Sequence, residues 1–116
     1  RPSAPVWSIA GDGGFQMTLQ ELATVTEEKL PVKIAVFNNG YLGMVRQWQQ
    51  FFYNSSYVAT EYTHNPDFVK LAEAYGARGI KAEGPEQLES ALREALAIDA
   101  PTLIEVPVGM MPPPFG

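Results

Sequence analysis

The chain has 116 residues, enough for one compact domain, and 46% of them are hydrophobic, so it can bury a substantial core. Its formal net charge of −5 and the lack of a basic cluster argue against nucleic acid or an anionic membrane as the main partner. The absence of cysteine excludes a disulfide scaffold, a thiol nucleophile and a cysteine-ligated metal, and no apolar run is long enough to span a bilayer.

The N-terminal part of the chain predicts a strand, a turn, a helix and a second strand, in that order. Residues 6–10 are mostly apolar and indicate a buried strand, which ends in the glycine-rich turn of residues 11–14. Thr18 and Glu21 have the spacing of a capping box, so we expect the helix to begin at Thr18. Residues 32–37 are mostly β-branched and apolar, which is typical of a strand in a parallel sheet that is covered on both faces.

The middle of the chain predicts two further helices with a loop between them. Apolar side chains recur at helical spacing over residues 42–52, and the aperiodic residues 53–64 indicate a loop. Asn65 and Pro66 have the chemistry of a helix start, with Asn65 as the N-cap and Pro66 in the first turn. Gly76 is expected to end this helix.

The C-terminal part continues the alternation of strands and helices. Residues 78–82 predict a short strand, residues 84–86 open the last helix, and residues 102–107 predict the last strand. The proline-rich residues 112–116 can continue neither a helix nor a sheet. The whole pattern predicts the α/β class, as a parallel sheet flanked by helices on both faces.

Two polar turns follow the first two predicted strands, at the edge of a parallel sheet where ligands usually bind. Asp12 lies among glycines in the first turn, and Asn39 lies in the Asn-Asn-Gly sequence of the second. Either turn alone is also ordinary turn chemistry, without the lysine of a phosphate-binding loop. Because about one strand–helix–strand unit separates them, a right-handed crossover would bring Asp12 and Asn39 to one point. A carboxylate, an amide oxygen and a backbone carbonyl would suit Mg²⁺ shared with phosphate oxygens.

Several stretches of the chain resemble the thiamine diphosphate-dependent enzymes, and most closely the large catalytic subunit of acetolactate synthase (acetohydroxyacid synthase). They are residues 11–24 (GDGGFQMTLQELAT), 38–49 (NNGYLGMVRQWQ), 65–68 (NPDF) and 72–76 (AEAYG). The resemblance therefore covers most of the chain. It implies the α/β thiamine diphosphate-binding fold, with residues 1–116 as part of the C-terminal domain that binds the diphosphate and Mg²⁺.

The resemblance also implies roles for individual residues. Asp12 and Asn39 would ligate Mg²⁺ through their side chains, and Tyr41 would do so through its backbone carbonyl. Trp48 would line the channel by which substrate reaches the cofactor and would help to select the second 2-keto acid. Backbone amides around Gly13, Gly14, Gly43 and Met44 would hold the diphosphate. The full set of residues expected to bind the cofactor is Gly11, Asp12, Gly13, Gly14, Asn39, Tyr41, Gly43 and Met44.

The implied activity is decarboxylation of pyruvate and ligation of the two-carbon unit to a second 2-keto acid, in branched-chain amino acid biosynthesis or acetoin-type metabolism. No catalytic residue is expected in this chain, because the activating glutamate of the family belongs to another domain. We therefore expect residues 1–116 to be part of a longer enzyme and to be inactive alone. The sequence shows no signal-peptide pattern, and we expect the longer enzyme to be cytoplasmic. We expect it also to form a homodimer or homotetramer.

Two alternatives stay open at this point. One is a related thiamine diphosphate-dependent decarboxylase or carboligase, because residues 106–109 depart from the acidic ending usual in biosynthetic acetolactate synthases. The other is a non-catalytic α/β interaction domain that retains the fold. The presence of both Asp12 and Asn39 argues against this second alternative.

Overall fold

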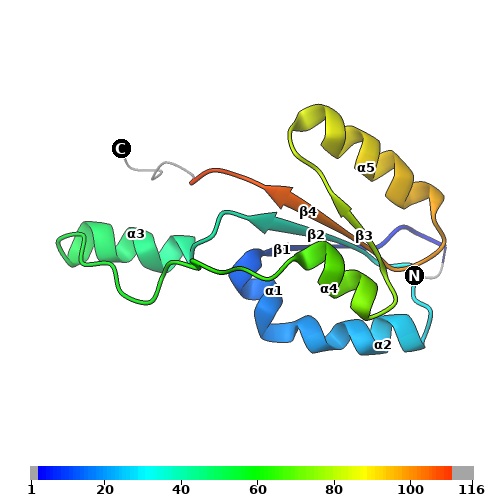
Figure 1. Cartoon of the computed structure of the whole chain (residues 1–116), viewed down its shortest axis with the longest axis horizontal. Coiled ribbons are helices and arrows are strands. Elements are labelled where there is room, and N and C mark those ends of the chain that lie inside the picture. The colour runs from blue at the N-terminus through cyan, green and yellow to red at the C-terminus, as the bar shows by residue number, and fades with distance from the viewer. Residues whose placement is uncertain (1–2, 111–116) are drawn as a thin grey trace.

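The computed structural model of the chain describes residues 3–110, so the expectation for residues 112–116 lies outside the described part. Within residues 3–110 the strands β1 (Trp7–Gly11), β2 (Lys33–Asn38), β3 (Arg78–Lys81) and β4 (Thr102–Pro107) form one parallel sheet. Their order is β1-β2-β4-β3 (Figure 1). The predicted fold class is confirmed, and the first two predicted strands are indeed neighbours in the sheet.

Helices cover both faces of this sheet (Figure 1). On one face lie α1 (Asp12–Thr18), the 3₁₀ turn η1 (Leu19–Glu21), α2 (Leu22–Glu27) and α4 (Phe68–Ala74), and on the other lies α5 (Pro85–Ala97). Helix α3 (Gly43–Phe52) covers neither face and extends away from the sheet, beyond the carboxyl end of β2. The radius of gyration is accordingly 15.7 Å, above the roughly 13 Å of a compact domain of about 100 residues. Among residues 3–110, no helix has the length and apolar character needed to cross a membrane.

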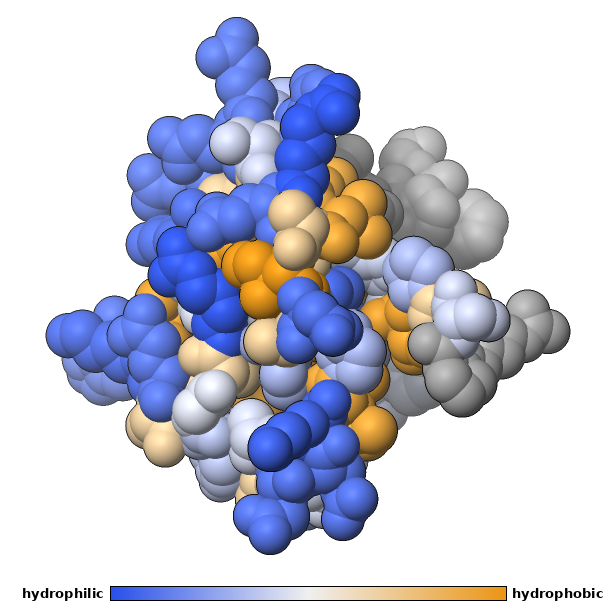
Figure 2. All heavy atoms as spheres, turned by 90° about the vertical axis from the view of Figure 1, so that its right-hand side faces the viewer, coloured by the Kyte–Doolittle hydropathy of each residue, from blue (hydrophilic) through white to orange (hydrophobic). Residues whose placement is uncertain are grey.

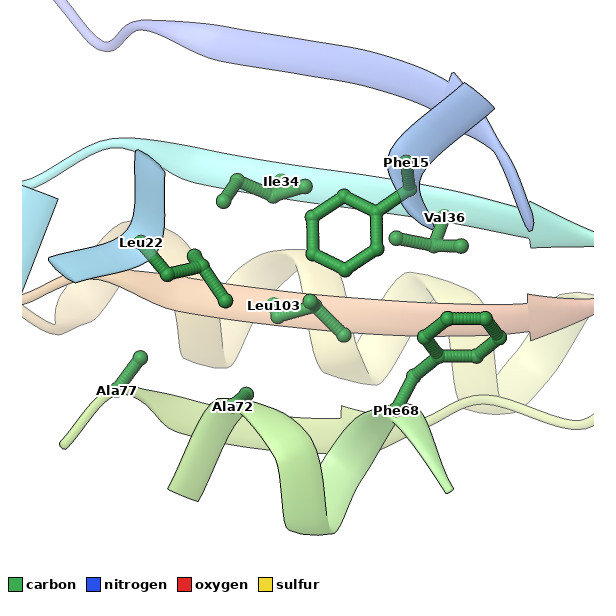
Figure 3. Close-up of a cluster of buried hydrophobic side chains, with 8 residues drawn as sticks. All are labelled: Phe15, Leu22, Ile34, Val36, Phe68, Ala72, Ala77 and Leu103. Carbon is green, nitrogen blue, oxygen red and sulfur yellow. The ribbon is translucent and has the colours of Figure 1, made fainter. Parts of the chain in front are cut away.

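The larger hydrophobic core lies between the sheet and the α1–α2–α4 layer. Figure 3 shows its buried side chains: Phe15, Leu22, Ile34, Val36, Phe68, Ala72, Ala77 and Leu103. The rings of Phe15 on α1 and Phe68 on α4 meet edge to face, with centroids 5.8 Å apart, which is a favourable aromatic geometry. A second cluster on the opposite face packs Ala91 and Ala95 of α5 against Ile104 of β4. The sheet therefore has a buried surface on both sides, as the sequence predicted.

The first strand and the first helix differ from the predictions. Strand β1 is an edge strand of the described sheet rather than a buried one, and Ile9 is 74% exposed. An additional helix, α1, begins at Asp12 and ends at Thr18, and the helix predicted to begin at Thr18 is present as η1 and α2. Thr18 makes no capping hydrogen bond through its side chain. The glycine-rich segment expected to be a turn is thus the first turn of α1. Tertiary packing explains the early start, because it carries Phe15 into the core against Phe68.

The start of α4 also differs from the prediction, although its end does not. The N-cap is Asp67, whose side chain accepts a hydrogen bond from the Lys70 backbone N–H at 3.0 Å. Asn65, the expected cap, lies two residues farther upstream and makes contacts with α1 instead. Gly76 follows the helix with a φ of +87°, in the left-handed region expected of a glycine that ends a helix.

The end of the molecule opposite α3 carries a buried lysine. Lys33 of β2 donates hydrogen bonds from Nζ to the carbonyl oxygens of Ile98 and Ala100, which follow α5. Burial lowers the pKa of Lys33 below its usual value, while the carboxylate of Asp99 opposes this shift. Hydrophilic side chains cover most of this end, with apolar ones showing between them (Figure 2). Lys33 thus satisfies carbonyl groups at the C-terminal end of α5, where a cation is favourable.

Candidate functional site

A cavity of about 660 Å³ opens at the carboxyl ends of β1, β2 and β4. Its walls are the first turn of α1, the loop after β2, the first turn of α3 and the residues that follow β4. All eight residues that the sequence predicted to bind a cofactor line this cavity: Gly11, Asp12, Gly13, Gly14, Asn39, Tyr41, Gly43 and Met44. The segments that follow β1 and β2 thus meet at one edge of the sheet, as the strand order predicted for Asp12 and Asn39.

Asp12 is a buried acid in the wall of the cavity, with only 2% of its surface exposed. Its Oδ2 accepts hydrogen bonds from the Gly40 backbone N–H at 3.1 Å and from Asn65 Nδ2 at 2.7 Å. These bonds offset part of the cost of burying a carboxylate. Within residues 3–110 no group donates to Oδ1, and no buried side-chain oxygen lacks a partner, so Oδ1 opens on the cavity. Asp12 thus presents one free oxygen to a ligand.

The loop after β2 is shaped by its own two asparagines. Asn39 Oδ1 accepts a hydrogen bond from the Tyr41 backbone N–H at 3.0 Å, and Asn38 Oδ1 accepts one from the Gly40 N–H at 3.2 Å. Gly40 has a φ of +75°, which a residue with a side chain rarely adopts. Because the same Gly40 N–H also donates to Asp12, the conformation of this loop is coupled to the position of the acid.

The donor atoms around the cavity fit a hard divalent cation. Within the described residues, Asp12 Oδ1 and the Tyr41 carbonyl oxygen accept no hydrogen bond, and Asn39 Oδ1 accepts one, so each has a lone pair available. Such oxygens are the ligands that Mg²⁺ prefers, together with water and phosphate oxygens. Residues 3–110 contain no group of three His, Cys, Asp or Glu side chains placed to hold a metal ion. The candidate ligands are therefore one carboxylate, one side-chain amide oxygen and one backbone carbonyl oxygen.

Backbone amides form another part of the cavity wall. A Cβ at Gly13 would lie 2.8 Å from both Leu42 Cδ2 and Tyr62 Oη, so the ends of these two side chains would have to move if another residue replaced this glycine. Gly43 and Met44 begin α3, so their backbone amides have no intrahelical partner, and the N-cap residue Leu42 supplies no side-chain acceptor for them. Amides at a helix start favour an anion. The cavity thus offers oxygen ligands for a cation beside N–H donors for an anion.

Three side chains that organise the site were not predicted: Asn65, Asn38 and Gln16. Asn65 Nδ2 donates to Asn38 Oδ1 at 2.9 Å, and Asn65 Oδ1 accepts a hydrogen bond from Gln16 Nε2 at 3.0 Å. Asn38 Nδ2 in turn donates to Glu105 Oε1 on β4, at 2.9 Å. The sequence did carry one signal for Asn65, because Asp67 can also cap α4 and leaves Asn65 available for another role.

Trp48, the residue predicted to line a substrate channel, lies outside this cavity. It lines a neighbouring hollow of about 580 Å³ along α3, and its side chain is 58% exposed. Val45 borders both the cavity and this hollow, so Trp48 lies about one helical turn farther along α3. Its role in selecting a substrate stays a prediction.

Comparison with known proteins identifies the family. Residues 1–106 match the family model described as thiamine pyrophosphate enzyme, C-terminal TPP binding domain. The chain belongs to this family. Thiamine pyrophosphate and thiamine diphosphate are two names for one compound, so the family supports the cofactor that the sequence predicted.

Two relatives and one solved structure show which members of the family this domain resembles. It is similar to acetolactate synthase of Mycobacterium avium, 52% identical over 94% of this chain and 18% of that protein. It is also similar to the acetolactate synthase isozyme 2 large subunit of Escherichia coli, 46% identical over 93% of this chain and 20% of that protein. The solved structure is a thiamine diphosphate-dependent 4-hydroxybenzoylformate decarboxylase of Rhodococcus jostii RHA1, with a TM-score of 0.89 and 34% identity over 95% of this chain and 21% of that one. The chain thus spans about a fifth of the length of these proteins.

Proposed function

We propose that the cavity at the carboxyl ends of β1, β2 and β4 holds the diphosphate of TPP through a shared Mg²⁺ ion. The observation that carries this proposal is Asp12, a buried carboxylate with one oxygen hydrogen-bonded twice and the other open on the cavity. A bound cation would neutralise this charge and link it to an anionic ligand. Membership in the TPP-binding family supplies the anion.

The remaining ligands of this proposed site come from the neighbouring segments. Asn39 would coordinate the cation through Oδ1 and Tyr41 through its carbonyl oxygen, since both line the cavity and retain a lone pair. The diphosphate oxygens would accept hydrogen bonds from backbone amides of the lining residues at the starts of α1 and α3: Gly13, Gly14, Gly43 and Met44. In this arrangement the domain binds and orients the diphosphate end of the cofactor.

We propose further that the domain is part of an acetolactate synthase-like enzyme, which is a TPP-dependent transferase or lyase. Such an enzyme decarboxylates pyruvate and ligates the two-carbon unit to a second 2-keto acid. When bound, TPP supplies the electron sink for this chemistry. The identities of 52% and 46% with two acetolactate synthases support this substrate class. We assign no catalytic residue to this chain, because the family resemblance puts the activating glutamate in another domain.

A second candidate function is a decarboxylase that acts on an aryl 2-keto acid. It is favoured by the similarity in fold, with a TM-score of 0.89, to a 4-hydroxybenzoylformate decarboxylase. The lower sequence identity of 34% makes it the weaker of the two proposals. The two functions differ in their products, since only the first forms a new carbon–carbon bond.

We propose that the chain is one domain of a longer cytoplasmic enzyme, and that the rest of this enzyme covers α3. The relatives are about five times as long as the chain, and α3 has no buried residue of its own. Trp48, Phe51 and Phe52 expose from 46% to 75% of their surface. An exposed apolar surface of this kind is typical of an interface, including the subunit interface of a homodimer or homotetramer.

The test is the substitution Asp12→Ala in the full-length protein, with TPP binding measured by titration calorimetry in the presence of Mg²⁺. Removal of a direct ligand should weaken binding by more than the roughly 10–100-fold that loss of an outer-shell partner costs. Asp67→Ala is the control, because Asp67 caps α4 and does not line the cavity. Unchanged affinity in Asp12→Ala would overturn the proposed cation site.

A further inference from the structure

Asn65 connects the candidate cation site to a different part of the chain. Its Nδ2 donates to Asp12 Oδ2 at 2.7 Å and to Asn38 Oδ1 at 2.9 Å, so both of its N–H groups are used. Its Oδ1 accepts a hydrogen bond from Gln16 Nε2 at 3.0 Å, which fixes the orientation of the amide. Asn65 therefore contacts both segments that line the cavity, α1 and the loop after β2, although it is distant from each in sequence.

The packing beneath Asn65 holds it at a constant distance from Asp12. Phe68, three residues after Asn65, is fully buried, and Phe15 lies three residues after Asp12. The rings of Phe15 and Phe68 pack edge to face with centroids 5.8 Å apart (Figure 3). Because this pair is buried in the larger core, α1 and the start of α4 are fixed relative to each other.

We propose that Asn65 is a positioning residue of the cation site, an inference that rests on the proposed function. Together with the Gly40 N–H it occupies Asp12 Oδ2, so that the carboxylate is held with Oδ1 toward the cavity. Through Asn38 it also holds the loop that carries the other candidate ligands. Without Asn65 the carboxylate can rotate away from the cation, and the two ligand segments lose their common contact.

The test compares Asn65→Leu with Asp67→Ala in the full-length protein. Leucine branches at Cγ as asparagine does but can neither donate nor accept a hydrogen bond there. Asp67→Ala removes the cap of α4 and leaves the Asn65 amide in place. The probe is Mn²⁺ in the presence of TPP, with free Mn²⁺ measured by electron paramagnetic resonance. Thermal melting without metal or cofactor is recorded for the same variants.

We expect Asn65→Leu to raise the Kd for Mn²⁺ by about 10–100-fold, the usual effect of losing an outer-shell partner. Asp67→Ala should lower the melting temperature while changing this Kd less than about twofold, since its effect is on helix stability. If Asn65 had a purely structural role, both variants would have lower melting temperatures than the unaltered protein, and both would bind Mn²⁺ with the same Kd as that protein. That pattern would overturn the proposal.

Two further variants keep the outcome decisive. If Asn65→Leu does not fold, Asn65→Ser is tested in its place, because serine is too small to reach both Asp12 Oδ2 and Asn38 Oδ1. Asn65→Ser should also raise the Kd for Mn²⁺. An unchanged Kd would overturn the proposal. Asp12→Ala separates this inference from the proposed function. If Asp12→Ala weakens Mn²⁺ binding and Asn65→Leu does not, only the role of Asn65 is overturned. If Asp12→Ala leaves the Kd unchanged, the cation site itself is wrong, and the role of Asn65 falls with it.

Discussion

The cavity at the strand ends and the helix that projects beyond it are built in different ways. Around the cavity, Asp12, Asn38 and Asn65 form a hydrogen-bonded cluster that rests on the larger core. Helix α3 has no buried residue, and its apolar side chains face outward. The side chains of the first region are held by contacts within the described residues, whereas the second region exposes a surface that we propose another domain covers.

The few contacts that hold α3 and the returning loop are mostly polar. Gln49 donates from Nε2 to the Val58 carbonyl and accepts from Thr60 Oγ1, each at 2.9 Å. The guanidinium of Arg46 lies over the ring of Tyr41 at 4.6 Å and over that of Tyr57 at 3.9 Å, both within the range of a cation–π interaction. These contacts fix the shape of the loop and leave the apolar side chains of α3 free to meet a partner. The two regions thus differ in how many of their side chains are held by contacts within the described residues.

The largest expected effect is on the chain alone. Isolated residues 1–116, supplied with Mg²⁺, TPP and pyruvate, should release no acetolactate and no CO₂ above background, because no described residue at the cavity other than Asp12 carries a carboxylate. With Trp48, Phe51 and Phe52 exposed, it should also associate, which light scattering would detect. The full-length protein is the control. Comparable turnover by the two proteins would show that the chain carries its own activating acid.

An intermediate effect is expected within the wall of the cavity itself, at two adjacent glycines. Gly13→Ala should lower the free energy of unfolding by up to about 2 kcal/mol, because the Leu42 and Tyr62 side-chain ends 2.8 Å from its Cβ must move, and the helix preference of alanine offsets part of this cost. Gly14→Ala is the matched control, with no atom within 4 Å of its Cβ, and should be neutral or up to about 1 kcal/mol more stable because alanine favours a helix. Denaturant titration of the full-length variants without cofactor measures both. Equal effects at the two positions would mean that the wall can yield at Gly13.

The smallest effect is expected on the projecting helix. Trp48→Leu should leave the melting temperature and TPP affinity nearly unchanged, since Trp48 is 58% exposed and lies outside the cavity. It should still change the ratio of products formed from two competing 2-keto acids by about fivefold. This change corresponds to about 1 kcal/mol, the low end for an altered apolar contact. Product analysis by chromatography measures this ratio. An unaltered ratio would leave Trp48 with a role in packing only.

Patterns along the chain were sufficient for most elements of the fold. The helical spacing of residues 42–52 predicted α3, and the run at residues 102–107 coincides with β4. The alternation of strands and helices predicted a parallel sheet, and from it the meeting of Asp12 and Asn39 at one edge. These predictions succeed because periodicity and strand order are properties of the chain itself. The eight residues that the family resemblance indicated at residues 11–24 and 38–49 are likewise all found in the wall of the cavity.

Only the tertiary structure decided where helices begin and which side chains support the site. A capping box at Thr18 and an Asn-Pro pair at residue 65 are local signals, and both were outweighed by contacts with distant residues. Helix α1 starts at Asp12, which places Phe15 against Phe68 in the core. Asn65 donates a hydrogen bond to Asp12 instead of capping α4. A helix cap contributes about 1 kcal/mol, whereas burying an aromatic ring or pairing a buried carboxylate contributes more. Where a local cap and a distant contact compete for the same residue, the contact that contributes more free energy therefore decides the structure. Here that contact involves residues far away in the sequence, so the local sequence cannot predict it.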